Sequence, residues 1–254
     1  MRRCRSSKPN ILFLVMVCTL CVILAHAGVV GDNELYGELP RVAAPAVDRS
    51  ATGAWDVLSE MRALGRLEVE GPVLQIVREC VELSVCGRPL PGVTRLLGDA
   101  DAKPEVEQAL VRRSAGVFVT VVRNNSVRAC VGSVWPQCAN LVDEIVYLAT
   151  QVAARDFRRA PIEPWELPTC EYAVSIVGRL ERVSPHEEWS PKTYGVFVRA
   201  GQKSGVILPG EALTHAKQVS WARDEAGISP AERCEVYRFQ TVKFGCSLDL
   251  RRGQ

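Results

Sequence analysis

Residues 127–133 read Val127-Arg128-Ala129-Cys130-Val131-Gly132-Ser133, a short run in which valine and alanine alternate with other residues. The apolar run 116–122 comes shortly before it, and Arg123-Asn124-Asn125-Ser126 separates the two. Those four residues are of the types that tolerate turns and left-handed backbone conformations, so the pattern predicts a β-hairpin. Period-two alternation then predicts that Val127, Ala129 and Val131 line one face of the returning strand, with Arg128, Cys130 and Gly132 on the other.

The second of these faces predicts a candidate site. It offers a thiol, a fixed cation and a residue with no side chain to obstruct a ligand. A guanidinium beside a thiol stabilises its thiolate, which would make Cys130 a nucleophile or a redox thiol. The alternative is that Cys130 is a half-buried small residue of a sheet. A general base for Cys130 would have to be His186 or His215, and both lie in polar stretches.

The remaining periodicities predict an α+β protein. Apolar residues at helical spacing follow Gly71 up to Val85, with Cys80 on the apolar face as a small buried residue. Strands reached by hairpins, with helices between them in no regular β-α order, indicate a largely antiparallel sheet. Further helices are expected at 54–64, where the helix should be peripheral, at 104–113, 137–155 and 212–226, and in one turn after Ser229. Strands are expected at 172–180, 194–199, 204–208 and 235–244. Loops are expected at 88–103 and 156–169.

The N-terminal 27 residues have the features of an export signal. Residues 1–8 carry four basic and no acidic groups, residues 11–25 are apolar or small, and Ala25-His26-Ala27 matches the A-x-A cleavage pattern. The segment predicts a cleaved signal peptide, and therefore an exported protein, or else an uncleaved membrane anchor. Residues 28–70 are expected to be a linker with a short helix, 71–246 the folded domain and 247–254 a tail.

Charge and cysteine content limit the classes of function. Removal of residues 1–27 takes away four of the 31 basic residues and none of the 29 acidic ones, leaving 27 against 29. This balance argues against nucleic acid as the main partner. Seven cysteines remain, an odd number, so at least one stays free or pairs outside the chain. No C-x-x-C spacing occurs, and we expect no metal or other cofactor. A disulfide between Cys130 and Cys138 is an alternative that would abolish a thiol mechanism.

Several of these pieces, in the same order, are found in one family. The chain resembles the AMMECR domain family over roughly 71–246. The matching pieces are the run 116–120, the strand 127–133, Ala153-Ala154-Arg155-Asp156, the strand near Val174, residues 204–209, Ala226-Gly227-Ile228 and residues 235–239. The family signature is Leu-Arg-Gly-Cys-Ile-Gly, which Arg128, Cys130 and Gly132 match. Ala129 replaces its middle glycine. Asp156 and Arg158 match the family's Asp-Pro-Arg-Phe loop, whose proline and phenylalanine are missing here.

The resemblance implies a two-part α+β fold with a cleft beside the cysteine motif. It also implies Memo-like and radical SAM proteins as possible partners, although an export signal would separate this chain from cytosolic ones. No activity follows from the family. Trp135 and Trp165 flank loops near the motif and are candidates for the cleft wall, with ordinary packing as the alternative.

The sequence thus predicts a cleft that binds a small anionic or peptide-like ligand. Three functions stay open: an accessory binding module without catalysis, a thiol-dependent enzyme with Cys130 as nucleophile, and a redox or metal-handling protein that uses several cysteines. Contact with a membrane is expected only through an uncleaved N-terminal segment. The predicted ligand-binding residues are Arg128, Gly132, Ser133, Arg155, Asp156 and Arg158. The guanidinium groups of the three arginines suit carboxylate and phosphate, with a surface salt bridge to Asp156 or Glu171 as the alternative.

Overall fold

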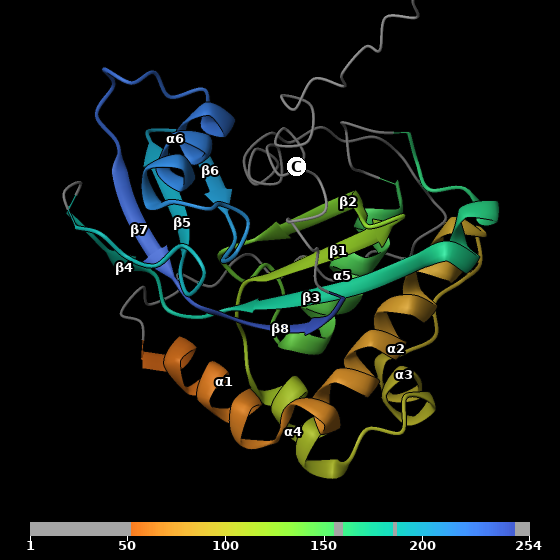
Figure 1. Ribbon diagram of the computed structural model, residues 1–254. Coiled ribbons are helices and arrows are strands. Elements are labelled where there is room, and N and C mark those ends of the chain that lie inside the picture. The colour runs from red at the N-terminus through yellow and green to blue at the C-terminus, as the bar shows by residue number, and fades with distance from the viewer. Residues whose placement is uncertain (1–51, 155–159, 185–186, 247–254) are drawn as a thin grey trace, which may run out of the picture.

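The computed structural model describes residues 52–154, 160–184 and 187–246 (Figure 1). The predicted export segment, most of the predicted linker and the predicted tail lie outside these ranges. The helices are α1 (Thr52–Ala63), α2 (Arg66–Val85), α3 (Val93–Asp99), α4 (Pro104–Arg112), α5 (Leu141–Ala154), the 3-10 helix η4 (Pro164–Thr169) and α6 (His215–Ala226). The strands are β1 (Val117–Arg123), β2 (Ser126–Ser133), β3 (Cys170–Val177), β4 (Glu181–Arg182), β5 (Gly195–Ala200), β6 (Lys203–Ile207), β7 (Glu235–Phe239) and β8 (Thr241–Gly245).

The predicted hairpin is β1 and β2, which pair antiparallel. Asn124 and Asn125 form its two-residue turn with φ angles of 53° and 56°. Positive φ at both central residues matches the twist of the two strands, which is why asparagine suits this turn. The hairpin belongs to a four-stranded antiparallel sheet in the order β2-β1-β3-β8.

A β-bulge in β2 corrects the predicted alternation. Val122 pairs with Val127, but Val121 pairs with Ala129, so Arg128 is an extra residue without a directly opposite partner. A bulge of this kind locally breaks the period of two. Val127 therefore shares the face of Cys130, and the expected placement of Arg128 and Cys130 side by side on one face is wrong.

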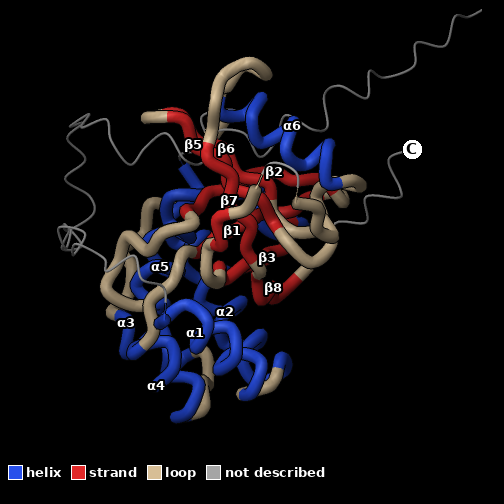
Figure 2. Tube along the Cα trace, turned by 90° about the vertical axis from the view of Figure 1, so that its left-hand side faces the viewer, coloured by secondary structure: helices blue, strands red, loops and turns tan. Residues whose placement is uncertain are grey.

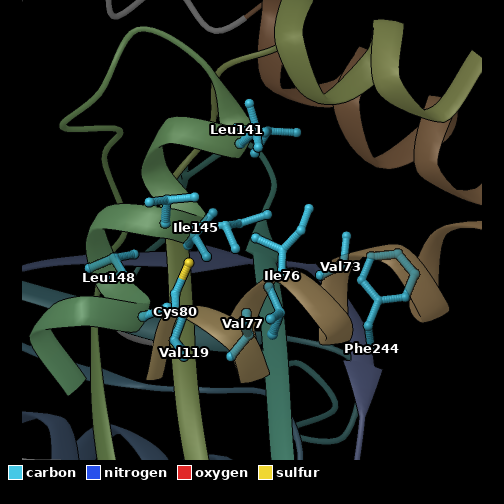
Figure 3. Close-up of a cluster of buried hydrophobic side chains, with 14 of the residues drawn as sticks. Val73, Ile76, Val77, Cys80, Val119, Leu141, Ile145, Leu148 and Phe244 are labelled. Atoms are coloured by element: carbon cyan, nitrogen blue, oxygen red, sulfur yellow. The ribbon is translucent and has the colours of Figure 1, made fainter. Parts of the chain in front are cut away.

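Helices cover one face of this sheet. α2 and α5 pack on each other and on the sheet, and their apolar side chains meet those of β1, β3 and β8 in the main core (Figures 1 and 3). Cys80 lies in this core, as expected, and burial raises the pKa of its thiol to about 12. Helix α1 was expected to be peripheral, but Val57, Leu58 and Met61 are buried in the same core.

The second sheet has the order β4-β7-β5-β6 and carries α6 on one face. Figure 2 shows α6 with β5 and β6 at one end of the molecule and α1 to α4 at the other. The α6 helix begins after Thr214, whose hydroxyl accepts a hydrogen bond from the backbone N–H of Lys217, and ends at Gly227 with φ 63°. Such a polar N-cap and left-handed C-terminal glycine are favoured helix ends.

The single strand expected at 235–244 is two strands, β7 and β8, which lie in different sheets and are separated by Gln240. A third apolar cluster joins side chains from both sheets: Phe118, Cys130, Val134, Val177, Phe197, Val206, Leu208 and Phe239. The fold is therefore α+β with two antiparallel sheets, which confirms the predicted fold class.

Other differences are local. α2 begins at Arg66 rather than near Gly71, with Pro72 inside the helix. Helix α3 occupies part of the expected loop 88–103, η4 ends the expected loop 156–169, and the turn after Ser229 is not helical. Among the described residues, we find no helix that combines the length and apolar character needed to cross a membrane.

Candidate functional site

Cys130 lies inside the protein and not beside an open groove. Only 1% of it is exposed, and it belongs to the cluster between the two sheets with Phe118 and Val134. Its sulfur lies 3.3 Å from the hydroxyl oxygen of Thr120, the residue directly opposite on β1. A thiol in this environment has no path to a bulky substrate in the structure as it stands, which weighs against a nucleophilic role.

Gly132 and Ser133 also serve the hairpin. A Cβ on Gly132 would overlap the carbonyl oxygen of Val117 and the ring of Phe118, so glycine is required by the close approach of β1. The hydroxyl of Ser133 accepts a hydrogen bond from the backbone N–H of Trp135 at 3.1 Å and so closes the turn after β2. Ala129, where the family has glycine, points its methyl into the main core.

Arg128 reaches from the bulge to the segment before β3. Its Nε and Nη2 donate to the two carboxylate oxygens of Glu166 at 2.7 and 2.8 Å, and Nη2 also donates to the backbone carbonyls of Ala160 and Pro161. Only 6% of the Glu166 side chain is exposed. The Arg128 guanidinium, hydrogen-bonded to Glu166, lowers the pKa of that carboxyl to about 2. A two-point pair of this kind fixes geometry as well as charge.

Glu166 has a further local role that explains the shape of η4. Its Oε2 accepts the backbone N–H of Glu163 at 2.9 Å, the return half of a capping box around Pro164. The carboxylate therefore satisfies a backbone donor at the start of the 3-10 helix and two side-chain donors from β2 at once. No sequence signal distinguishes this glutamate from its neighbours, because its principal partner is 38 residues away.

A second arginine and an exposed tryptophan complete the arrangement. The Nη1 of Arg123 donates to Glu166 at 3.4 Å and its Nε to the hydroxyl of Thr169 at 2.8 Å. Its guanidinium carbon lies 4.7 Å from the ring centroid of Trp165, which is 64% exposed. The Trp165 indole N–H donates to Glu163 at 2.8 Å, which holds the ring in place. We call Arg123, Arg128, Trp165 and Glu166 the arginine corner.

The other predicted site residues fall elsewhere. Arg155, Asp156, Arg158 and the candidate base His186 lie outside the described residues. His215 is the first residue of α6, and its ring meets that of Trp189 edge-on, with 4.0 Å between the centroids. Trp135, two residues after the end of β2, is 40% exposed.

The cysteines of the described residues are all free thiols, and the alternative disulfide between Cys130 and Cys138 is not formed. Cys138 lies beside Glu144, and burial together with that carboxylate raises the pKa of its thiol to about 12. Within the described ranges, we find no group of three or more metal-ligating side chains.

Glu144 is a buried acid in the first turn of α5. Its side chain is fully buried, and its Oε2 accepts the backbone N–H groups of Gln137 and Cys138, both at 2.7 Å. Burial raises the pKa of this carboxyl. These two hydrogen bonds fix the loop between β2 and α5, which follows the cysteine motif in the chain.

The fold and the site thus define a two-sheet α+β protein with a buried cysteine motif and an arginine corner on its outer side. The AMMECR1 family profile matches residues 92–244, more than half of the chain, and the protein belongs to this family.

Relatives agree with this assignment. The chain is 36% identical to a Thermotoga maritima protein over 143 residues, which are 55% of this chain and 82% of that protein. It is 30% identical to a Clostridium acetobutylicum protein over 130 residues, half of this chain but only 28% of that protein. The crystal structure of an uncharacterised protein from Pyrococcus horikoshii has the same fold, with a TM-score of 0.56, 22% identity, and coverage of 74% of this chain and 95% of that one.

Proposed function

We propose that this domain is a binding module without catalytic activity and that the arginine corner receives a small, peptide-like carboxylate. The observation that carries the proposal is the set of unused donors on Arg123. A guanidinium has five N–H donors. Residues in the described ranges accept two of them, through Thr169 and Glu166, which leaves donors on Arg123 for the paired oxygens of a carboxylate.

Trp165 supplies the second half of recognition. Its exposed ring lies next to the Arg123 guanidinium, so a ligand that carries a carboxylate and a flat amide or aromatic group can contact both. The two negative charges of Glu163 and Glu166 balance the two positive charges of Arg123 and Arg128. The corner therefore favours a ligand with both features over a bare inorganic anion, and binding of a single small molecule should be weak, about millimolar.

The arrangement is preorganised. Arg128 and Glu166 fix the segment that carries Trp165 against the edge strand β2, through contacts that are largely shielded from water. A preformed receptor loses less conformational entropy when a ligand binds. The buried position of Cys130 fits the same function, since the motif then supports the corner instead of attacking a substrate.

Titration with N-acetyl-phenylalanine, followed by the NMR signal of the Trp165 indole N–H, tests the proposal. We expect saturable shifts with this carboxylate and much smaller shifts with its amide, N-acetyl-phenylalaninamide. Arg123→Gln should weaken binding at least about fivefold, because the carboxylate loses its charged partner.

Arg238 provides a matched control. Its guanidinium lies 4.9 Å from the ring of Tyr194 in the second sheet, but Glu181 and Glu187 both accept from it. Arg238→Gln should leave the titration unchanged. Equal affinity for acid and amide, or equal loss in the Arg123 and Arg238 variants, would contradict the proposed function.

A further inference from the structure

A cavity of about 390 Å³ lies between α6 and the start of β7, far along the chain from the arginine corner. One wall is a stripe of α6 residues at four-residue spacing, His215, Val219 and Arg223, and the opposite wall is the segment 232–236. A second hollow of about 460 Å³ adjoins it along β4 and shares Ser184, Cys234 and Val236. Cys234 therefore lines both hollows, and it is partly exposed.

The sulfur of Cys234 has a cation as its neighbour. The Nη1 of Arg223 donates to it at 2.7 Å, while Nη2 donates to the backbone carbonyls of Ser229 and Glu232. These carbonyl contacts hold the guanidinium in place against the sulfur. In thiol–disulfide exchange the sulfur attacks as a thiolate, and the fixed guanidinium lies where it can donate to that sulfur.

The charged groups around the cavity favour an anionic ligand. Glu232 is paired with Lys203 at 2.9 Å and Glu235 with Arg199 at 2.7 Å, so neither acid is left to offset the arginines of the lining. Arg233 lines the cavity, is exposed and forms no ion pair with any residue of the described ranges. Positive charge at the mouth raises the local concentration of anions.

His215 lines the cavity and has a buried ring nitrogen. Among the described residues, its Nε2 has no hydrogen-bond partner. Its neighbour Trp189 is fixed by a bond to Gln218 at 2.8 Å, so the wall is rigid.

From these four observations we infer that Cys234 is a modification site for small anionic disulfides such as glutathione disulfide. The Cys234 thiol loses its proton to water, its thiolate attacks one sulfur of the disulfide, and a mixed disulfide forms. The other half leaves as a thiolate. The Cys234 sulfur is thereby oxidised and the leaving half reduced, so the exchange needs no further reactant. The carboxylates of the bound half face Arg223 and Arg233.

The test compares two disulfides on the reduced full chain, glutathione disulfide and the cationic cystamine, with peptide mass mapping over time. Cys86, which is exposed at the C-terminal end of α2, is the internal control. We expect Cys234 to react with glutathione disulfide faster than Cys86 does, although it is less exposed, and to lose this advantage with cystamine. Arg233→Glu should slow the reaction of Cys234 with glutathione disulfide about tenfold and speed that with cystamine.

Two results would overturn the inference: faster reaction of Cys86 than of Cys234 with glutathione disulfide, or the same rate of Cys234 with both disulfides. Arg233 is exposed, so its replacement leaves the fold intact, and Cys86 in the same sample reports any general change in reactivity.

Discussion

Arg128 and Glu166 form a two-point ion pair that ties the bulge of β2 to the 3-10 helix before β3, with N–O distances of 2.7 and 2.8 Å. The pair turns an arginine of the family motif into a structural support. It also fixes the segment that carries the exposed Trp165 next to Arg123. The cysteine of the motif, in contrast, is buried in the cluster between the two sheets.

This pair makes stability depend on pH in the acid range. The folded-state pKa of Glu166 is about 2, below its ordinary value of 4.5, so the stabilisation is present above the unfolded pKa and is lost as pH falls through the folded value. Glu166→Gln should lower the free energy of unfolding at pH 7 by about 2 kcal/mol, after allowance for solvent screening. Urea unfolding between pH 7 and pH 3 should show this difference shrinking below about pH 4.5.

Glu163→Gln is the matched control, because that carboxylate is exposed and bonds only the Trp165 indole among the described side chains. It should change stability by less than about 0.5 kcal/mol. Stability curves for the wild type and Glu166→Gln that stay parallel across this pH range would show that the ionisation of Glu166 does not stabilise the fold.

Gly132 should resist substitution. Gly132→Ala places a methyl against the Val117 carbonyl and the Phe118 ring, which forces β1 and β2 apart and should cost about 2–3 kcal/mol. Gly98 lies inside α3 with open space around a Cβ and no proline after it, so Gly98→Ala should instead add about 0.5 kcal/mol by improving helix propensity. Thermal unfolding of the two variants separates these signs, and a stable Gly132→Ala protein would refute the packing argument.

The hairpin could be predicted from the sequence because Asn124 and Asn125 adopt the backbone conformation that their residue type favours. The bulge could not. Alternation along Val127–Val131 is equally compatible with a regular strand, and only pairing with β1 shows that Arg128 is the extra residue. The ion pair of Arg128 with Glu166 could not be predicted for another reason. It joins residues 38 positions apart in the sequence, and the proline-rich stretch before Glu166 has no periodic pattern that would predict its structure.

Glu144 should behave in the opposite sense to Glu166. Burial raises its pKa, so the stability associated with its protonated form is present below the unfolded pKa and is lost as pH rises through the folded value. Glu144→Gln keeps an oxygen for the N–H groups of Gln137 and Cys138 and removes the cost of a buried charge. It should leave stability at pH 7 unchanged or increase it.

Glu144→Ala is the contrasting variant. It leaves both N–H groups without their acceptor and should cost about 2–4 kcal/mol at pH 7. Denaturant unfolding of the two variants decides the matter: if glutamine is as damaging as alanine, the carboxylate charge itself is needed, and the loop is held by electrostatics rather than by hydrogen bonds.

The accessibility of Cys130 separates a structural motif from a thiol enzyme. Its sulfur is buried among Phe118, Val134 and the facing side chains of the second sheet. A reagent must wait for the two sheets to separate, so labelling should follow the rate of opening and not the concentration of thiolate. We expect iodoacetamide to modify Cys86 in the native protein within minutes, while Cys130 is modified only when urea is added. Peptide mass mapping at several reagent concentrations measures both. Rapid native labelling of Cys130 would show that the sheets part readily and would return Cys130 to the role of a nucleophile.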